Sequence, residues 1–134
     1  VRRTIVERLT IQGVGFVTLA HPTAVIGSRV AIGEGTLIMA NVTTTVEIKI
    51  GRHVVINPAC TLAHDVRIGD FSYLSPGCDL AGAAVLEEAA YLGTAAVVLP
   101  HRTIGAGSVL GAGGVAVQDV APGVTAAGVP ARKL

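Results

Sequence analysis

Large aromatic rings and cysteines are scarce in this 134-residue sequence. It contains no tryptophan, two tyrosines and two phenylalanines, so aromatic residues make up only 3 % of it. An ordinary globular core uses more large rings, which indicates an interior filled by small side chains in a regular arrangement. Two cysteines are too few for a disulfide scaffold. Hydrophobic residues make up 51 % and charged residues 14 %, a composition that excludes a disordered chain.

Basic clusters and long apolar runs are also missing. The formal net charge is +1, and Lys and Arg occur together only as short pairs near the two ends. A nucleic-acid binder carries a basic patch or stripe, so the sequence excludes this class. No apolar run is long enough to cross a bilayer, and no signal peptide is recognisable. We therefore expect a cytoplasmic protein with neither a membrane nor a nucleic-acid partner.

Glycine is abundant, with 17 residues, and aliphatic residues recur with a period of six. Of the fifteen positions reached by steps of six from Ile26 to Leu110, fourteen are Ile, Leu or Val, and Thr44 is the exception. Glycine often follows the aliphatic position, and a small or β-branched residue stands two positions before it. This period is neither helical nor that of a simple strand. It predicts a short strand and a turn, repeated, with glycine providing turn angles that other residues resist.

The two ends depart from this repeat. Residues 1–13 predict a short helix with Ile5 and Leu9 on an apolar stripe and Gly13 as its cap. The last segment predicts a tail that covers the open end of the repeats, which would otherwise pair edge to edge with another molecule. We divide the chain into a helix and linking strand over 1–19, a β-helix over 20–116 and a capping tail over 117–134.

The repeat resembles that of the hexapeptide-repeat acyltransferases, and the tail AGVPARKL resembles their closing signature. The resemblance implies an all-β, left-handed parallel β-helix of eighteen-residue, three-sided coils, about five in all. The stretch NPACTLAHDVRIGDFSYLSPGCDLAG is similar to the family members that acetylate sialic acids and UDP- or GDP-linked amino sugars. Those members carry an N-terminal βαβ domain, of which this chain would retain at most the final helix and strand.

Acyl transfer from a thioester needs a base that takes a proton from the nucleophile, and four histidines are candidates. Only His64 is followed directly by an acid, Asp65, whereas His21, His53 and His101 have no acidic neighbour in the sequence. A carboxylate beside an imidazole can fix its tautomer and orientation. The resemblance implies that His64 is the general base of an acetyl-CoA-dependent sugar acetyltransferase and that Asp65 is its partner.

The resemblance also implies an acceptor site and a cofactor site. Asn57 matches a polar position near the acceptor, and Tyr73 stands where the family often has a second histidine, nine residues after the first. Coils of eighteen residues stack Gly82 on His64, and a glycine there leaves room for the slender pantetheine arm of coenzyme A. The resemblance implies cofactor contacts for Tyr73, Gly82, Thr94 and Ala112. We also assign Arg132 and Lys133 to the cofactor site, because two cations can meet a phosphate-bearing ligand.

The family places this cofactor between the subunits of a trimer, and flat faces with few charges favour self-association. We therefore expect a homotrimer that acts on a sugar or nucleotide-sugar acceptor. Two alternatives stay open: a serine-type or other small-molecule O-acetyltransferase, and a structural β-helix that lacks its substrate domain.

Two further expectations concern metal and disulfide sites. The spacings among His53, His64 and His101 do not reproduce the three-histidine pattern of the γ-type carbonic anhydrases, so we expect no metal. Cys60 and Cys78 are eighteen residues apart and should be neighbours in one interior column. We expect a packed pair of thiols there and not a disulfide, because the compartment is reducing.

Overall fold

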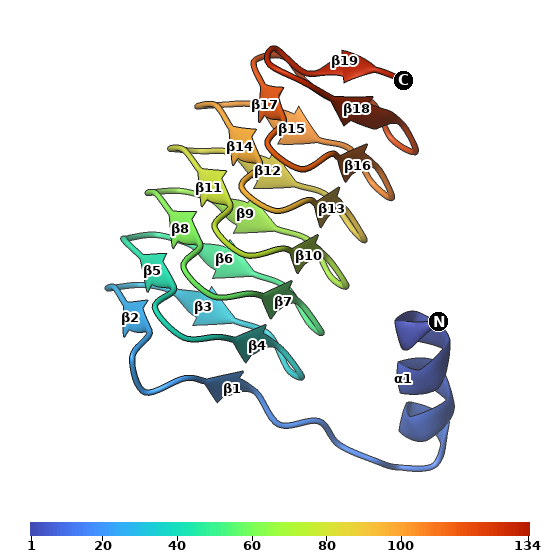
Figure 1. The fold of residues 1–134 in the computed structure, drawn as a ribbon. Coiled ribbons are helices and arrows are strands. Elements are labelled where there is room, and N and C mark those ends of the chain that lie inside the picture. The colour runs from blue at the N-terminus through green and yellow to red at the C-terminus, as the bar shows by residue number, and fades with distance from the viewer.

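Residues 1–134 form a stack of short strands with a single helix beside it in this computed structural model (Figure 1). The helix is α1 (Arg2–Ile11). Sheet A contains β1 (Leu19–Ala20), β4 (Leu37–Ile38), β7 (Val55–Ile56), β10 (Tyr73–Leu74), β13 (Tyr91–Leu92), β16 (Val109–Leu110), β18 (Thr125–Ala127) and β19 (Arg132–Lys133). Sheet B contains β2 (Val25–Ile26), β5 (Thr43–Thr44), β8 (Thr61–Leu62), β11 (Asp79–Leu80), β14 (Val97–Val98) and β17 (Val115–Ala116). Sheet C contains β3 (Ala31–Ile32), β6 (Lys49–Ile50), β9 (Arg67–Ile68), β12 (Val85–Leu86) and β15 (Thr103–Ile104).

The three sheets are the faces of a left-handed β-helix, and from β1 to β17 the strands that lie three places apart along the chain pair in parallel. Tyr73 pairs with Tyr91, eighteen residues on, so each turn of the solenoid uses three six-residue repeats. Near the C-terminal end Ile104 pairs with Val120, sixteen residues on, so the last turn is two residues shorter. The predicted architecture is confirmed, with about six turns instead of about five, because β1 and β18 also belong to the stack.

The aliphatic position of the repeat is the second residue of each strand and points inward. Ile56, Leu74 and Leu92 are fully buried, and the core is one continuous cluster of 24 buried residues. The exception, Thr44, is also buried, and its hydroxyl is satisfied because it accepts a hydrogen bond from the Gly27 amide at 3.1 Å. A polar residue is tolerated here because no buried hydrogen-bonding group is left without a partner.

The glycines that follow the aliphatic position have a different function from the predicted one. Seven glycines follow the aliphatic position directly, and none has a left-handed φ: Gly27, Gly33, Gly51, Gly69, Gly93, Gly105 and Gly111. The left-handed conformation occurs two residues later in each turn, mostly at residues with a side chain, such as Asn41 (φ 58°) and Ala95 (φ 55°). What requires glycine is the close approach of the next coil. A β-carbon on Gly69 would stand only 2.6 Å from the amide nitrogen of Glu88.

Helix α1 ends as predicted but packs differently. Gly13 has φ 76°, and its amide and the next one donate to carbonyls of the last helical turn, which is the glycine-capped end that the sequence predicts. The expected apolar stripe is not packed, since no helix side chain is buried and Ile5 is 51 % exposed. With ten residues, this helix is too short and too polar to cross a bilayer, and the structure has no other.

Two arginines hold the start of α1 against the solenoid. The guanidinium of Arg2 donates to the carbonyl of Phe71 at 2.6 Å, and its partial burial lowers the pKa of Arg2. Arg3 forms an ion pair with Glu88, and its guanidinium carbon lies 4.8 Å from the centre of the Phe71 ring. The helix is therefore attached by polar and cation–π contacts, not by an apolar face.

The interior also contains the two cysteines as free thiols. Both side chains are fully buried; Cys60 donates to the carbonyl of Ser75 and Cys78 to that of Gly93, each at 3.2 Å. The expected pair of packed thiols is confirmed. The hydrogen bond with Cys60, together with burial, raises the pKa of the Cys78 thiol.

Candidate active site

His64 and Asp65 lie at the corner where the chain turns from β8 in sheet B to β9 in sheet C. Adjacent residues of a strand point to opposite faces, but Asp65 has a left-handed φ of 61°, which bends the chain at the corner. As a result the two side chains meet, with Nδ1 of His64 2.9 Å from Oδ2 of Asp65. Both side chains are about 60 % exposed, so the pair is open to a substrate.

The other imidazole nitrogen of His64 lies against Gly82, one coil above. The Ala83 amide donates to the His64 carbonyl at 2.8 Å, which stacks the two corners directly. A β-carbon on Gly82 would stand 2.5 Å from Nε2 of His64. The absence of a side chain at Gly82 leaves a space in which the sequence predicts the pantetheine arm. In the structure the imidazole of His64 occupies part of this space.

Asn57, Thr94 and Ala112 lie at a different corner, where the chain turns from sheet A to sheet B. The side-chain amide of Asn57 donates to the carbonyl of Leu74 at 2.7 Å. Thr94 and Ala112 are exposed and lie one coil apart in one column, since the amide of the residue after Ala112 donates to the Thr94 carbonyl at 2.8 Å. The strands of sheet B separate this corner from His64, so these three residues and His64 do not converge within one protomer.

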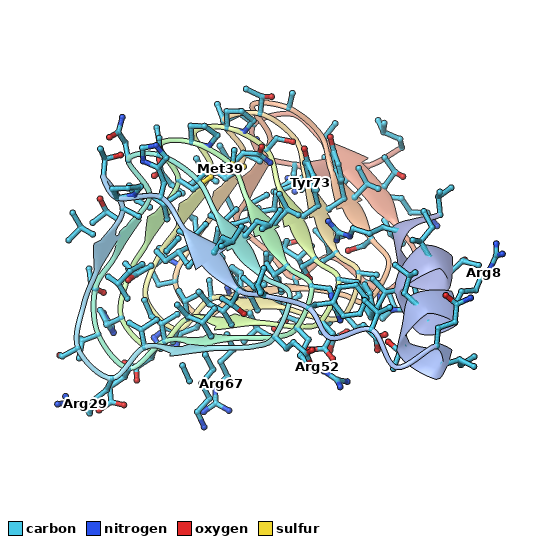
Figure 2. All side chains as sticks on the ribbon, turned by 90° about the horizontal axis from the view of Figure 1, so that it is seen from below. Arg8, Arg29, Met39, Arg52, Arg67 and Tyr73 are labelled. Carbon is cyan, nitrogen blue, oxygen red and sulfur yellow. The ribbon has the colours of Figure 1, made fainter.

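Tyr73 lies on the outer face of sheet A, away from His64. In the view along the solenoid, Tyr73 is on the opposite side from Arg67 of sheet C (Figure 2). Its ring stacks on that of Tyr91 with centres 5.4 Å apart and planes inclined by 4°. The buried Ser75 hydroxyl hydrogen-bonds the Tyr91 hydroxyl at 3.2 Å. A groove of about 430 Å³ lies here, lined by Arg2, Arg3, Phe71, Tyr73, Ala89 and Tyr91.

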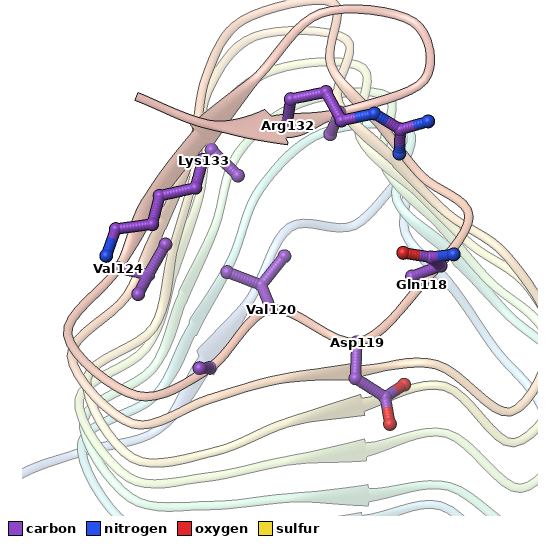
Figure 3. A pocket seen from close by; sticks show the side chains of 9 residues that line it. Gln118, Asp119, Val120, Val124, Arg132 and Lys133 are labelled. Carbon is purple, nitrogen blue, oxygen red and sulfur yellow. The ribbon is translucent and has the colours of Figure 1, made fainter.

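Arg132 and Lys133 form β19, which pairs antiparallel with β18 over the C-terminal end of the stack. They border a cavity of about 260 Å³ that also contacts Gln118 and Asp119. The two cationic side chains extend from β19 in opposite directions (Figure 3), as expected for neighbours in a strand. They therefore do not converge on a single anion within this protomer.

A groove that the sequence did not indicate lies on the outer face of sheet B. Its volume is about 250 Å³, and Ala63 and Ala81 on its edge directly precede His64 and Gly82. Asp79 of β11 lies in this groove, and its carboxylate accepts a hydrogen bond from the hydroxyl of Thr61. Asp79 could have been found in the sequence as an acid at an outward strand position, but only after the inward and outward faces of the strands had been assigned.

The other histidines lack the partner that His64 has. His53 is packed between Phe16 and Phe71, with ring centres 4.9 and 5.1 Å away, and His21 contacts the Thr23 hydroxyl at 2.9 Å. No three His, Cys, Asp or Glu side chains lie close enough together to hold a metal ion. The pair of His64 and Asp65 is thus the arrangement best suited to proton transfer.

Similarity to known proteins supports this assignment of the fold. PerB from Caulobacter crescentus, solved with CoA and GDP-perosamine, superposes with a TM-score of 0.97 at 38 % identity, over 99 % of this chain and 64 % of PerB. The acetyltransferase domain of PglB from Neisseria gonorrhoeae gives a TM-score of 0.96 at 34 % identity, over 99 % of this chain and 65 % of that domain.

A curated relative matches over a shorter stretch. The UDP-N-acetylbacillosamine N-acetyltransferase of Bacillus subtilis is 48 % identical over 40 residues, which are 30 % of this chain and 18 % of that protein. No family model matches the sequence. The chain spans less than two thirds of each of these relatives. By fold and by sequence the chain is a hexapeptide-repeat β-helix that resembles the corresponding part of the sugar N-acetyltransferases.

Proposed function

We propose that this protein transfers an acetyl group from acetyl-CoA to the amino group of a nucleotide-linked sugar, with His64 as the general base. The observation that carries the proposal is the contact between His64 and Asp65, which leaves Nε2 as the free nitrogen of an exposed imidazole. The similarity to PerB, which binds CoA and GDP-perosamine, supports the choice of cofactor and acceptor.

The carboxylate of Asp65 accepts the hydrogen bond of the Nδ1 proton, so the unprotonated Nε2 faces the reactants. Nε2 takes a proton from the acceptor amine while the amine nitrogen attacks the thioester carbonyl. The new C–N bond forms, the C–S bond of the thioester breaks, and the leaving thiolate of CoA recovers the proton from the imidazolium. Asp65 stabilises the imidazolium between these two steps.

We further propose that the active unit is a homotrimer. Tyr73 and Thr94 lie on other sides of the solenoid from His64, so a cofactor that contacts all three must lie between protomers. Gly82, Ala112, Arg132 and Lys133 complete the proposed cofactor groove, and Asn57 the acceptor site. Sedimentation equilibrium should give three times the chain mass of 13.5 kDa; a monomer with full activity would contradict the shared groove.

The activity is tested by measuring CoA release from acetyl-CoA with a panel of UDP- and GDP-linked amino sugars. His64→Ala should lower kcat by about 10²- to 10⁴-fold, the usual effect of a lost general base. The thermal midpoint should hardly change, since the side chain is exposed. His101→Ala is the matched control, because His101 is also exposed but has no acidic partner. Equal turnover of His64→Ala and the wild type would remove His64 from this role.

A further inference from the structure

Asp79 is the one acidic residue in a row of Val and Thr side chains on the outer face of sheet B. In each strand of sheet B the first residue points outward and the second inward. Asp is unfavourable at such a position in the middle of a sheet, whereas Val and Thr are favoured. A residue that breaks a local rule without a structural gain is the expected mark of a functional position. The outward row, from β2 to β17, is Val25, Thr43, Thr61, Asp79, Val97 and Val115.

The charge of Asp79 is also uncompensated within the chain. Its one hydrogen-bond partner is the neutral hydroxyl of Thr61, and no Lys, Arg or His lies within ion-pair distance. Every other acid of the solenoid meets a cation, a histidine or a backbone amide. Those pairs are Glu34 with the Phe16 amide, Glu47 with Arg29, Asp65 with His64, Asp70 with Arg52, Glu87 with the Ala106 amide, Glu88 with Arg3, and Asp119 with Arg102.

The position of this carboxylate connects it to the candidate active site. Asp79 and Thr61 lie in the groove of sheet B, and the edge of that groove is formed by the residues directly before His64 and Gly82. A molecule that fills the groove is therefore next to the imidazole. The volume of the groove, about 250 Å³, lies below the roughly 300–1,000 Å³ of pockets that enclose a drug-sized ligand, so the groove suits a small group such as one sugar ring.

We propose that Asp79 and Thr61 bind the sugar ring of the acceptor, with the Asp79 carboxylate accepting hydrogen bonds from the hydroxyl next to the reacting amino group. This inference rests on the proposed function and adds the residues that position its acceptor. A carboxylate accepts hydrogen bonds from hydroxyls at about twice the strength of a neutral acceptor, which makes an unpaired one suited to this contact. Thr61 holds the carboxylate toward the groove and offers its own oxygen to a second hydroxyl.

The experiment compares Asp79→Asn with the wild type, using GDP-perosamine as acceptor. The KM for the acceptor should rise about tenfold or more, because a hydrogen bond to a charged group is lost. The KM for acetyl-CoA should not change. A second acceptor, lacking the hydroxyl next to the amino group, should show an equally high KM with both proteins. That result identifies the hydroxyl as the group that Asp79 contacts, which a merely structural role would not produce.

Two variants separate binding from folding. Asp79→Val restores the β-branched row and should leave the thermal midpoint unchanged or higher while the acceptor KM rises as in Asp79→Asn. Asp70→Asn removes the same charge at the corner between sheets C and A and should leave both KM values unchanged. An unchanged acceptor KM in an active Asp79→Asn protein would overturn this inference alone. A wild-type protein that acetylates no amino sugar would overturn the proposed function and the inference with it.

Discussion

Gly82 provides the space in which the imidazole of His64 lies, one coil below it. A β-carbon on Gly82 would stand 2.5 Å from Nε2 and 2.6 Å from Cε1 of that ring. Since the ring also contacts Asp65 through Nδ1, its position is defined from two sides. The absence of a side chain at Gly82 therefore helps to orient His64, the proposed base.

Gly82→Ala should move the imidazole without unfolding the protein. The added methyl group meets only the end of a side chain, which can rotate away, and Gly82 does not have a left-handed φ. We expect kcat to fall at least tenfold while the free energy of unfolding changes by less than about 1 kcal/mol. Steady-state assays of CoA release measure kcat, and urea unfolding measures the free energy of unfolding.

Gly69→Ala is the matched control for this prediction. At that position the methyl group would meet the backbone of Glu88 at 2.6 Å, and a backbone cannot rotate away. Overpacking of this kind costs about 1–3 kcal/mol, so here stability should fall first. If Gly82→Ala lost as much stability as Gly69→Ala, the glycine would serve stacking and not the histidine.

Asp65→Asn should lower kcat about ten- to a hundredfold and leave the KM values nearly unchanged. Asn tolerates the left-handed φ of 61° at this position, so the corner keeps its shape. The amide lacks the charge that stabilises the imidazolium, which exists only during the reaction. Steady-state kinetics with acetyl-CoA and an amino-sugar acceptor test this, and a larger effect on KM than on kcat would speak for a binding role instead.

Replacing Arg2 and Arg3 together by Ala should release helix α1 and leave the solenoid intact. The double variant loses the hydrogen bond to Phe71 and the ion pair with Glu88, and no helix side chain is buried to hold the segment. An isolated ten-residue helix is marginal in water, so it should then unfold. Hydrogen exchange should show lost protection in α1 only.

Arg8→Ala provides the control for the helix, because Arg8 points away from the solenoid (Figure 2). This variant should keep the exchange protection of α1 within a factor of about two. Persistent protection of α1 in the double variant would mean that contacts other than the two arginines attach the helix.

The stability of the protein should fall above about pH 8.5, the usual pKa of a free thiol. The pKa of Cys78 is raised in the folded state, so the thiol keeps its proton there while the unfolded chain loses it. The stabilisation is complete below pH 8.5 and decreases by up to about 1.4 kcal/mol per pH unit above it. Urea unfolding of the wild type and Cys78→Ala at pH 7, 9 and 10 should show a weaker decrease in the variant.

Much of the fold could be predicted because the repeat is local. An aliphatic residue every six positions, with Thr44 as the exception, is enough to infer strands of one kind separated by turns of one kind. The stacking of Gly82 on His64 follows from the same count once a coil has eighteen residues. The predicted role of the glycines was wrong. Glycine is needed at Gly69 and the equivalent positions because the backbone of the next coil lies too close for a β-carbon, and this contact cannot be inferred from local backbone angles.

The candidate site could be predicted only in part. That His64 has an acidic neighbour follows directly from the sequence, because adjacency is a property of the chain. Three features depend on the folded chain: Asp65 turns toward the imidazole, Tyr73 lies on another face, and Asp79 has no ion-pair partner in a row of β-branched residues. The physical reason is that a three-sided coil sends residues close in sequence to different faces and brings residues one coil apart into contact.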